Sequence, residues 1–261
     1  MPPSTAAVDR APPAPFQRTV WWSLAAIALI LLGGAAFVVD CRLALWSLEG
    51  RWPRLVRELL TVSESFGHGM GVFLILVTLG VLDPSRRWAL PRVAALSLGA
   101  GILANVIKLL IVRTRPRAFG FEGDVWTTFG SWFPLASAGS GGQSFPSGHT
   151  ATAVGLAIAL SWLYPRGRYL FAVLAVLVAL QRIQSGSHYL SDTLVSAGLA
   201  IILGLALFHV GPAGRWFARR EARWRGRWRV RQAEKSGEDR RGGEERHRRA
   251  FEIGEPRRKI A

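Results

Sequence analysis

The sequence is poor in cysteine and in acidic residues. Cys41 is the single cysteine among 261 residues, so an intrachain disulfide is excluded, and we expect this side chain to pack rather than to react. Asp and Glu number 17 against 33 Lys and Arg, which gives a formal net charge of +16. No set of carboxylate, His or Cys residues suits a metal ion, so we expect no metal and no cofactor. Internal repeats are also absent.

Hydrophobic residues make up 50% of the chain, and they are concentrated in blocks. The first block, Val20–Val39, is long enough to cross a hydrocarbon core of about 30 Å. A cleaved signal peptide has a shorter apolar centre followed by a small-residue cleavage site, whereas Asp40, Cys41 and Arg42 follow this block directly. We therefore interpret it as a transmembrane helix.

Five further apolar blocks follow along the chain. They are Gly67–Leu82, Val93–Val112, Gly148–Tyr164, Tyr169–Leu180 and Tyr189–Val210. The fifth of the six blocks, Tyr169–Leu180, is short enough to be a buried soluble helix. We count it as a span because it gives an even number of spans that cross the membrane in alternating directions. The pattern predicts an all-α integral membrane bundle of six transmembrane helices over residues 19–211.

The two ends of the chain differ from this membrane domain. Residues 1–18 are rich in proline, and from about Ala233 the chain loses its aromatic residues, so we expect disorder in both segments. The basic tail, residues 212–261, begins with tryptophans and arginines at helical spacing: Trp216, Arg220, Trp224 and Trp228. This spacing suits a helix lying on an anionic membrane surface, and a solvated tail that only enforces topology is the equal alternative. Nucleic-acid binding is not expected, because the rest of the positive charge is spread along the membrane domain.

A first polar cluster lies at the end of the third block. Arg115 follows Lys108 by seven residues, about two helical turns, so both side chains are expected on nearly the same helix face, before Pro116 ends the helix. A lysine in an apolar segment costs roughly 2.5–3.5 kcal/mol at mid-membrane and less near an end, so Lys108 should have an anionic partner. Alternatively, Lys108 reaches the interface and the neighbouring arginines only touch lipid phosphates.

A second cluster, Pro146-Ser147-Gly148-His149, opens the fourth block. Ser147 is expected to cap the helix, which leaves free amides at Gly148 and His149 where the helix dipole favours a phosphate. Gly148 permits a close approach of the backbone, and His149 is placed to protonate a leaving oxygen. The alternative is an ordinary capped helix start with an interfacial histidine.

A third cluster joins the fifth block to the sixth. Arg182 ends one block, and His188 opens the next with Asp192 four residues later on the same helix face. Asp192 can accept a hydrogen bond from one ring nitrogen of His188, which leaves the other nitrogen free to attack phosphorus. The alternative is a structural His–Asp pair that holds the turn.

Together the three clusters resemble the three-part motif of the phosphatidic acid phosphatase type 2 and vanadium haloperoxidase superfamily. The resemblance covers residues 108–192, all three spacings agree, and the six blocks match the membrane branch of the superfamily. One position departs from the motif: the family usually has Ser before the arginine of the third cluster, and this chain has Gln181. Gln181 can still donate a hydrogen bond to a phosphate oxygen, but its role is left open.

The resemblance implies metal-independent hydrolysis of a lipid phosphate or polyprenyl diphosphate. His188 would form a phosphohistidine, Asp192 would orient it, and His149 would protonate the leaving group. The phosphate oxygens would be held by Lys108, Arg115, Ser147, Gly148 and Arg182. Two other functions remain open. One is a vanadate-dependent oxidoreductase of the haloperoxidase kind, but those enzymes are typically soluble and the six blocks argue against it. The other is a non-catalytic lipid-phosphate binding or transport protein, which would not need both histidines and Asp192.

The distribution of basic residues predicts the topology. With the N-terminus inside, most Lys and Arg fall in cytoplasmic segments, and the three clusters fall outside. We therefore expect both termini in the cytoplasm and an active site facing outward. The Ala- and Arg-rich composition is typical of a protein of the bacterial inner membrane. Neither the particular lipid nor the oligomeric state is predicted.

Overall fold

The computed structural model describes residues 15–133, 139–208 and 211–228, together with 230 and 234. It divides into two units, Met1–Arg215 and Trp216–Ala261. The segments expected to be disordered lie almost entirely outside the described residues. The exceptions are residues 15–18, where the first helix begins at Pro15, and Glu234.

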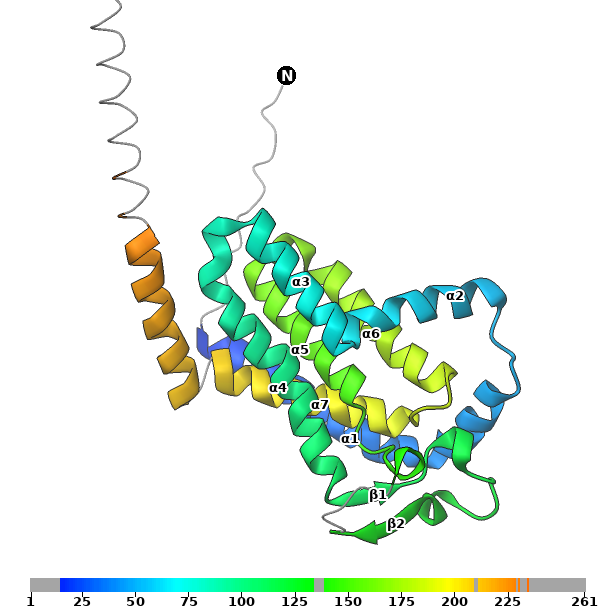
Figure 1. Cartoon of the computed structure of the whole chain (residues 1–261). Coiled ribbons are helices and arrows are strands. Elements are labelled where there is room, and N and C mark those ends of the chain that lie inside the picture. Colours follow the sequence, from blue (N-terminus) through cyan, green and yellow to red (C-terminus); the bar gives the residue numbers. More distant parts are fainter. Residues whose placement is uncertain (1–14, 134–138, 209–210, 229, 231–233, 235–261) are drawn as a thin grey trace, which may run out of the picture. The chain divides into compact units, whose positions relative to one another are not determined.

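The described chain is mostly helical (Figure 1), so the prediction of a helical membrane bundle is confirmed. The α-helices are α1 Pro15–Leu48, α2 Arg54–Ser63, α3 Gly69–Leu82, α4 Leu90–Lys108, α5 Gly148–Leu163, α6 Arg168–Gln184 and α7 Leu190–Phe208. The 3-10 helices are η1 Glu64–Gly67, η2 Pro84–Ala89, η3 Pro116–Ala118, η4 Val125–Thr128, η5 Ser140–Gly142 and η6 Pro165–Gly167. A small hairpin that the apolar pattern did not predict pairs β1, Ile111–Arg113, antiparallel with β2, Phe129–Trp132.

The predicted number of six spans is not confirmed within the described residues. Four helical stretches of the described chain are long and apolar enough to cross a membrane: Thr19–Leu48, Pro84–Lys108, Pro165–Gln184 and Leu190–Phe208. A fifth arises if Arg54–Gly67 and Gly69–Leu82, which meet at 68°, form one bent span. The remaining block is α5, whose 16 residues rise only about 24 Å, so six spans are not confirmed. The chain is a multi-pass membrane protein.

α5 lies at the centre of the membrane unit and packs against α4, α6 and α7. Small residues allow this close packing: a Cβ added at Gly155 would lie 2.8 Å from the carbonyl oxygen of Leu96 on α4. On the outside of the bundle, Leu31 and Val38 of α1 are 68% and 81% exposed. Such apolar side chains are suited to contact lipid tails, and the central position of α5 fixes the place of its first residues, Gly148 and His149.

The third predicted block is shorter than expected. α4 ends at Lys108, and the chain turns into β1 instead of continuing as a helix to Val112. The Phe133 amide donates to the Leu110 carbonyl at 2.7 Å, next to the β1–β2 pairing, so the backbone groups that a helix would have used bond to the second strand instead. In Figure 1 this hairpin lies at the end of the bundle where α4 ends and α5 begins.

Candidate active site

Six of the eight predicted site residues line one cavity. It has a volume of about 440 Å³ and lies between the end of α4, the start of α5 and the loop from α6 to α7. The six residues are Lys108, Arg115, Gly148, His149, Arg182 and His188. The other two, Ser147 and Asp192, are fully buried behind it. Side chains from three separate clusters of the sequence therefore converge on one space.

The start of α5 has the geometry that the sequence predicts. Ser147 is the N-cap, and its hydroxyl accepts a hydrogen bond from the Thr150 amide at 3.4 Å. The Ser147 amide donates to Ser196 Oγ on α7 at 2.7 Å, which ties the turn to the neighbouring helix. A Cβ added at Gly148 would lie 3.9 Å from Lys108 Nζ, so the first amides of α5 adjoin a cation. This combination favours an anion.

Lys108 and Arg115 reach the same cavity by a route that the sequence did not predict. Because α4 ends at Lys108, the two residues do not share a helix face as expected. The loop is fixed instead by the Arg115 amide, which donates to the Gly141 carbonyl at 2.8 Å. Burial, together with the charges of Arg117 and Arg182, lowers the pKa of the Arg115 guanidinium. The cations of the site therefore repel one another, and a bound phosphate would neutralise part of their charge.

His188 is buried, and its immediate partner is a backbone carbonyl. Its Nδ1 lies 2.5 Å from the Ser144 carbonyl oxygen and 3.7 Å from Asp192 Oδ2. The second distance is too long for the expected hydrogen bond to Asp192. Because a carbonyl only accepts hydrogen bonds, Nδ1 carries the proton, and Nε2 is left with a free lone pair. Burial lowers the pKa of His188 to about 4, although Asp192 opposes this, so the ring is neutral at neutral pH.

Asp192 belongs to a buried network that the sequence reasoning missed. Its Oδ2 accepts hydrogen bonds from Ser144 Oγ at 2.6 Å and from the Tyr189 amide at 2.9 Å, and its Oδ1 binds Arg113 Nη1. Asp192 thus holds Ser144, whose carbonyl holds His188. The carboxylate therefore acts on the histidine through a neighbour as well as through its charge.

Arg113 connects Asp192 to α1. Its Nη2 donates to Asp40 Oδ2 at 2.8 Å, and Arg113 and both carboxylate side chains are fully buried. Burial disfavours the charged guanidinium, but Asp192 and Asp40 more than offset this and raise the pKa of Arg113. The sequence showed Arg113 as one arginine among several, and nothing in the local pattern marked Asp40, which lies 73 residues away, as its partner.

A second carboxylate, Glu64 of η1, contacts two residues that line the cavity, Arg182 and His149. Arg182 Nη1 donates to Glu64 Oε1 at 2.5 Å, and Gln181 Nε2 donates to Glu64 Oε2 at 3.0 Å. Glu64 Oε1 also lies 3.7 Å from His149 Nε2. No sequence pattern marked this residue, because it lies outside all three clusters.

A third histidine also lines the cavity. His68 caps α3 by accepting a hydrogen bond from the Met70 amide at its Nδ1, at 3.2 Å, and its ring centroid lies 5.5 Å from that of His149. It went unnoticed because its neighbours in sequence are apolar or glycine. Within the described residues, no group of three or more His, Cys, Asp or Glu could hold a metal ion.

Taken together, these residues can bind and transfer a phosphoryl group. An uncharged imidazole with a free lone pair, a second imidazole, three cations and a helix start surround one space. This is the set that nucleophilic catalysis at phosphorus requires.

Comparison with known proteins agrees with this geometry. Residues 88–216 match the family model of the PAP2 superfamily. Two lipid A 1-phosphatases, from Rhizobium johnstonii and Rhizobium etli, are 40% and 39% identical over 101 residues, which make up 39% of this chain and 38% and 40% of theirs. The matched stretch is thus about two fifths of the length of these relatives.

Two solved structures are also similar. LpxE of Aquifex aeolicus has a TM-score of 0.47 and 23% identity over 64% of this chain and 93% of its own. The first transmembrane PAP2 type phosphatidylglycerolphosphate phosphatase from Bacillus subtilis has a TM-score of 0.45 and 20% identity over 74% of this chain and 94% of its own. The family model spans all three polar clusters, and through residues 88–216 the chain belongs to the PAP2 superfamily.

Proposed function

We propose that the protein hydrolyses a lipid phosphate without a metal ion, through a phosphohistidine. The observation that carries this proposal is His188, whose Nδ1 is bound to the Ser144 carbonyl while the ring lines a cavity with Lys108, Arg115 and Arg182. A neutral imidazole fixed in this tautomer presents a lone pair on Nε2 next to an anion site.

The reaction proceeds in two displacements. His188 Nε2 attacks phosphorus, the bond from phosphorus to the lipid oxygen breaks, and His149 gives its proton to that oxygen. Water then attacks the phosphohistidine, His149 takes a proton from the water, and the bond from phosphorus to nitrogen breaks. Inorganic phosphate leaves, and both histidines return to their starting states.

The cations and the helix start stabilise the charge that develops on the phosphoryl oxygens. Lys108, Arg115 and Arg182 supply fixed positive charge, and the Gly148 amide supplies a donor at the start of α5. Ser147 contributes by holding that helix start, since its own hydroxyl is engaged by Thr150.

The substrate proposal follows the relatives. Both curated relatives are lipid A 1-phosphatases, so a lipid A phosphate is the first substrate to test. Phosphatidate, phosphatidylglycerol phosphate and a polyprenyl diphosphate present the same phosphoryl chemistry and complete the panel.

The test is phosphate release by detergent-solubilised protein from this panel, ranked by kcat/KM. We expect turnover in the presence of a chelator, inhibition by vanadate, and complete loss of turnover in His188→Ala. Arg168→Ala, which changes an exposed arginine at the start of α6, should match the wild type. Undiminished turnover by His188→Ala, or activity that requires added magnesium, would overturn the mechanism.

The proposed topology has both termini in the cytoplasm and the cavity facing outward, as the basic residues suggest. The sole cysteine makes this testable, because Cys41→Ser provides a cysteine-free background. In that background, Trp126→Cys in η4 should react with a membrane-impermeant maleimide in intact cells, and Arg166→Cys in η6 should react only after lysis. The reverse pattern would invert the topology.

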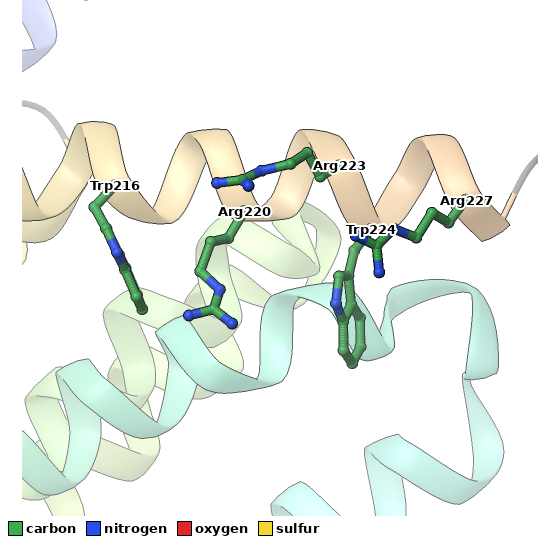
Figure 2. Close-up of a pocket in the computed structure, with 5 residues that line it drawn as sticks. All are labelled: Trp216, Arg220, Arg223, Trp224 and Arg227. Atoms are coloured by element: carbon green, nitrogen blue, oxygen red, sulfur yellow. The ribbon is translucent and has the colours of Figure 1, made fainter.

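The basic tail is proposed to bind anionic lipid at the membrane surface. Residues 212–228 are helical, and Figure 2 shows Trp216, Arg220 and Trp224 along one side of this helix, lining a hollow of about 290 Å³ with Arg223 and Arg227. Arg220 lies over the Trp216 ring at 4.8 Å, and the two tryptophans are 47% and 52% exposed. Exposed aromatic rings beside cations suit lipid headgroups.

The test compares proteolysis of the tail in proteoliposomes of neutral and of anionic lipid. Anionic lipid should protect the wild type from trypsin but not the Trp216→Ala/Trp224→Ala variant, which keeps every arginine cleavage site. Equal cleavage of the wild type in both kinds of vesicle would indicate a solvated tail.

A further inference from the structure

One carboxylate, Glu64, connects two predicted site residues to the position at which the chain departs from the family motif. It comes from η1, between α2 and α3, and its two oxygens contact Arg182, Gln181 and His149. Two of these residues belong to the predicted phosphate site, and the third is the position at which the chain leaves the family pattern.

The contacts fix the orientation of Arg182. Its Nη1 is held by Glu64 Oε1 at 2.5 Å, and its Nη2 is held by Ser187 Oγ at 3.0 Å. Arg182 Nε is buried and has no hydrogen-bond partner within the described residues. Leaving a buried donor unsatisfied costs about 1–3 kcal/mol, which a phosphate oxygen could recover. Glu64 therefore holds the guanidinium at one end while leaving a donor unpaired.

Glu64 itself is set back from the reacting space. Arg182 and His149 both line the cavity, whereas Glu64 is absent from its described lining. A carboxylate lining the cavity would repel a phosphate, but one behind the guanidinium offsets part of the excess positive charge. Burial disfavours the charged imidazolium of His149, the form that can donate a proton, and Glu64, at 3.7 Å from His149 Nε2, opposes that effect.

Gln181 fits this arrangement better than the usual serine. Its side chain is 5% exposed, and its amide reaches Glu64 Oε2 at 3.0 Å from α6. A serine hydroxyl at the same backbone position is about two bonds shorter and would fall short of that oxygen. The Gln181 amide is therefore engaged by Glu64, and the residue that replaces the usual serine has a partner in η1.

We propose that Glu64 is a positioning residue that orients Arg182 and His149, and that Gln181 holds Glu64 in place. This inference rests on the proposed phosphatase function. Glu64 forms no bond to the substrate, so its effect is exerted on the turnover number and on the binding of a transition-state mimic.

The experiment measures kcat, KM and vanadate inhibition for Glu64→Ala, Glu64→Gln, Gln181→Ser and the Glu64→Ala/Gln181→Ser double variant in detergent. Small displacements of catalytic groups cost up to about 10²-fold, so we expect Glu64→Ala to lose roughly 10- to 100-fold in kcat, with a smaller change in KM. Glu64→Gln keeps an acceptor for Arg182 and should lose less. The double variant should be no worse than Glu64→Ala, since Gln181 acts through Glu64.

Glu58 provides a matched control. It is a glutamate on the adjoining helix α2, and its carboxylate pairs with Arg54 at 2.8 Å on the exposed surface. Glu58→Ala and Glu58→Gln should retain wild-type kcat, KM and vanadate inhibition.

The outcomes separate positioning from a merely structural role. Both Glu64 variants keeping wild-type kcat and vanadate affinity would overturn the inference, as would activity lost only in proportion to the unfolded fraction. If the wild type releases no phosphate from any lipid, the proposed function fails instead. Binding of vanadate by the wild type and by Glu64→Ala, measured by calorimetry, still tests the inference: equal affinities overturn it, and weaker binding by the variant supports it.

Discussion

The two histidines of the site are supported by two different arginine–carboxylate networks. On the His188 side, Arg113 bridges Asp40 and Asp192 with all three side chains fully buried. On the His149 side, Arg182 pairs with Glu64, whose side chain is 33% exposed. The first network lies behind the site and the second borders the cavity, so we expect the first to support folding and the second to adjust the binding site.

Their surroundings explain this difference. The Arg113 guanidinium lies over the rings of Tyr189 and Phe129, at 4.1 Å and 4.7 Å from their centroids. It is therefore surrounded by aromatic rings and two carboxylates instead of water. Arg182 keeps a donor that is not satisfied within the described residues. Arg113 thus has its charge offset by two carboxylates inside the protein, whereas Arg182, at the cavity, has a donor left that can bind a ligand.

The largest expected effect is the loss of stability in Arg113→Met. This change leaves Asp40 and Asp192 buried without their cation, and breaking a buried pair typically costs about 3–5 kcal/mol. The measurement is the unfolding midpoint of the detergent-solubilised protein. Arg57→Ala, which removes an exposed arginine of α2, is the control and should match the wild type. A wild-type midpoint in Arg113→Met would mean that the buried network does not support the fold.

The next largest effect is the loss in kcat in Asp192→Asn. It tests whether Asp192 acts on His188 directly or through Ser144. Because Nδ1 is held by the Ser144 carbonyl and not directly by Asp192, the tautomer should survive, and the loss in kcat should lie near the lower end of about 10²–10⁴-fold. The comparison is with His188→Ala in the same phosphate-release assay. If Asp192→Asn is as inactive as His188→Ala, the direct charge of Asp192 matters more than the hydrogen-bonded chain.

These two networks also show the limits of reading the sequence. Lys108, Arg115, His149, Arg182 and His188 could be predicted, because each lies in a short local pattern at the edge of an apolar block. The partners Asp40, Glu64 and Ser144 could not, since their contacts join segments far apart in the chain. The helical class followed from block composition, but the β1–β2 hairpin did not, because Ile111 and Val112 continue the apolar block that ends α4.

A smaller effect is the pH dependence on the His188 side. Burial lowers the pKa of His188 from an ordinary 6.5 to about 4, so the folded protein binds fewer protons than the unfolded chain between these values. This contribution to stability is fully present above about pH 6.5 and is lost as the pH falls towards 4 and below. The unfolding midpoint of the wild type should fall across that window, and that of His188→Gln should fall less. Parallel curves would contradict the shift.

The smallest expected effect is the stability change in Glu64→Gln, and it tests the comparison most directly. Glu64→Gln keeps an acceptor for Arg182, and a single hydrogen bond contributes about 0.5–1.5 kcal/mol, so this variant should unfold within roughly 1 kcal/mol of the wild type even where its turnover falls. The measurement pairs the unfolding midpoint with kcat on the same sample, with Glu58→Gln as the control. A loss of stability as large as that of Arg113→Met would show that both networks serve the fold, and the contrast between them would fail, because Glu64 would then support folding as well as the orientation of Arg182.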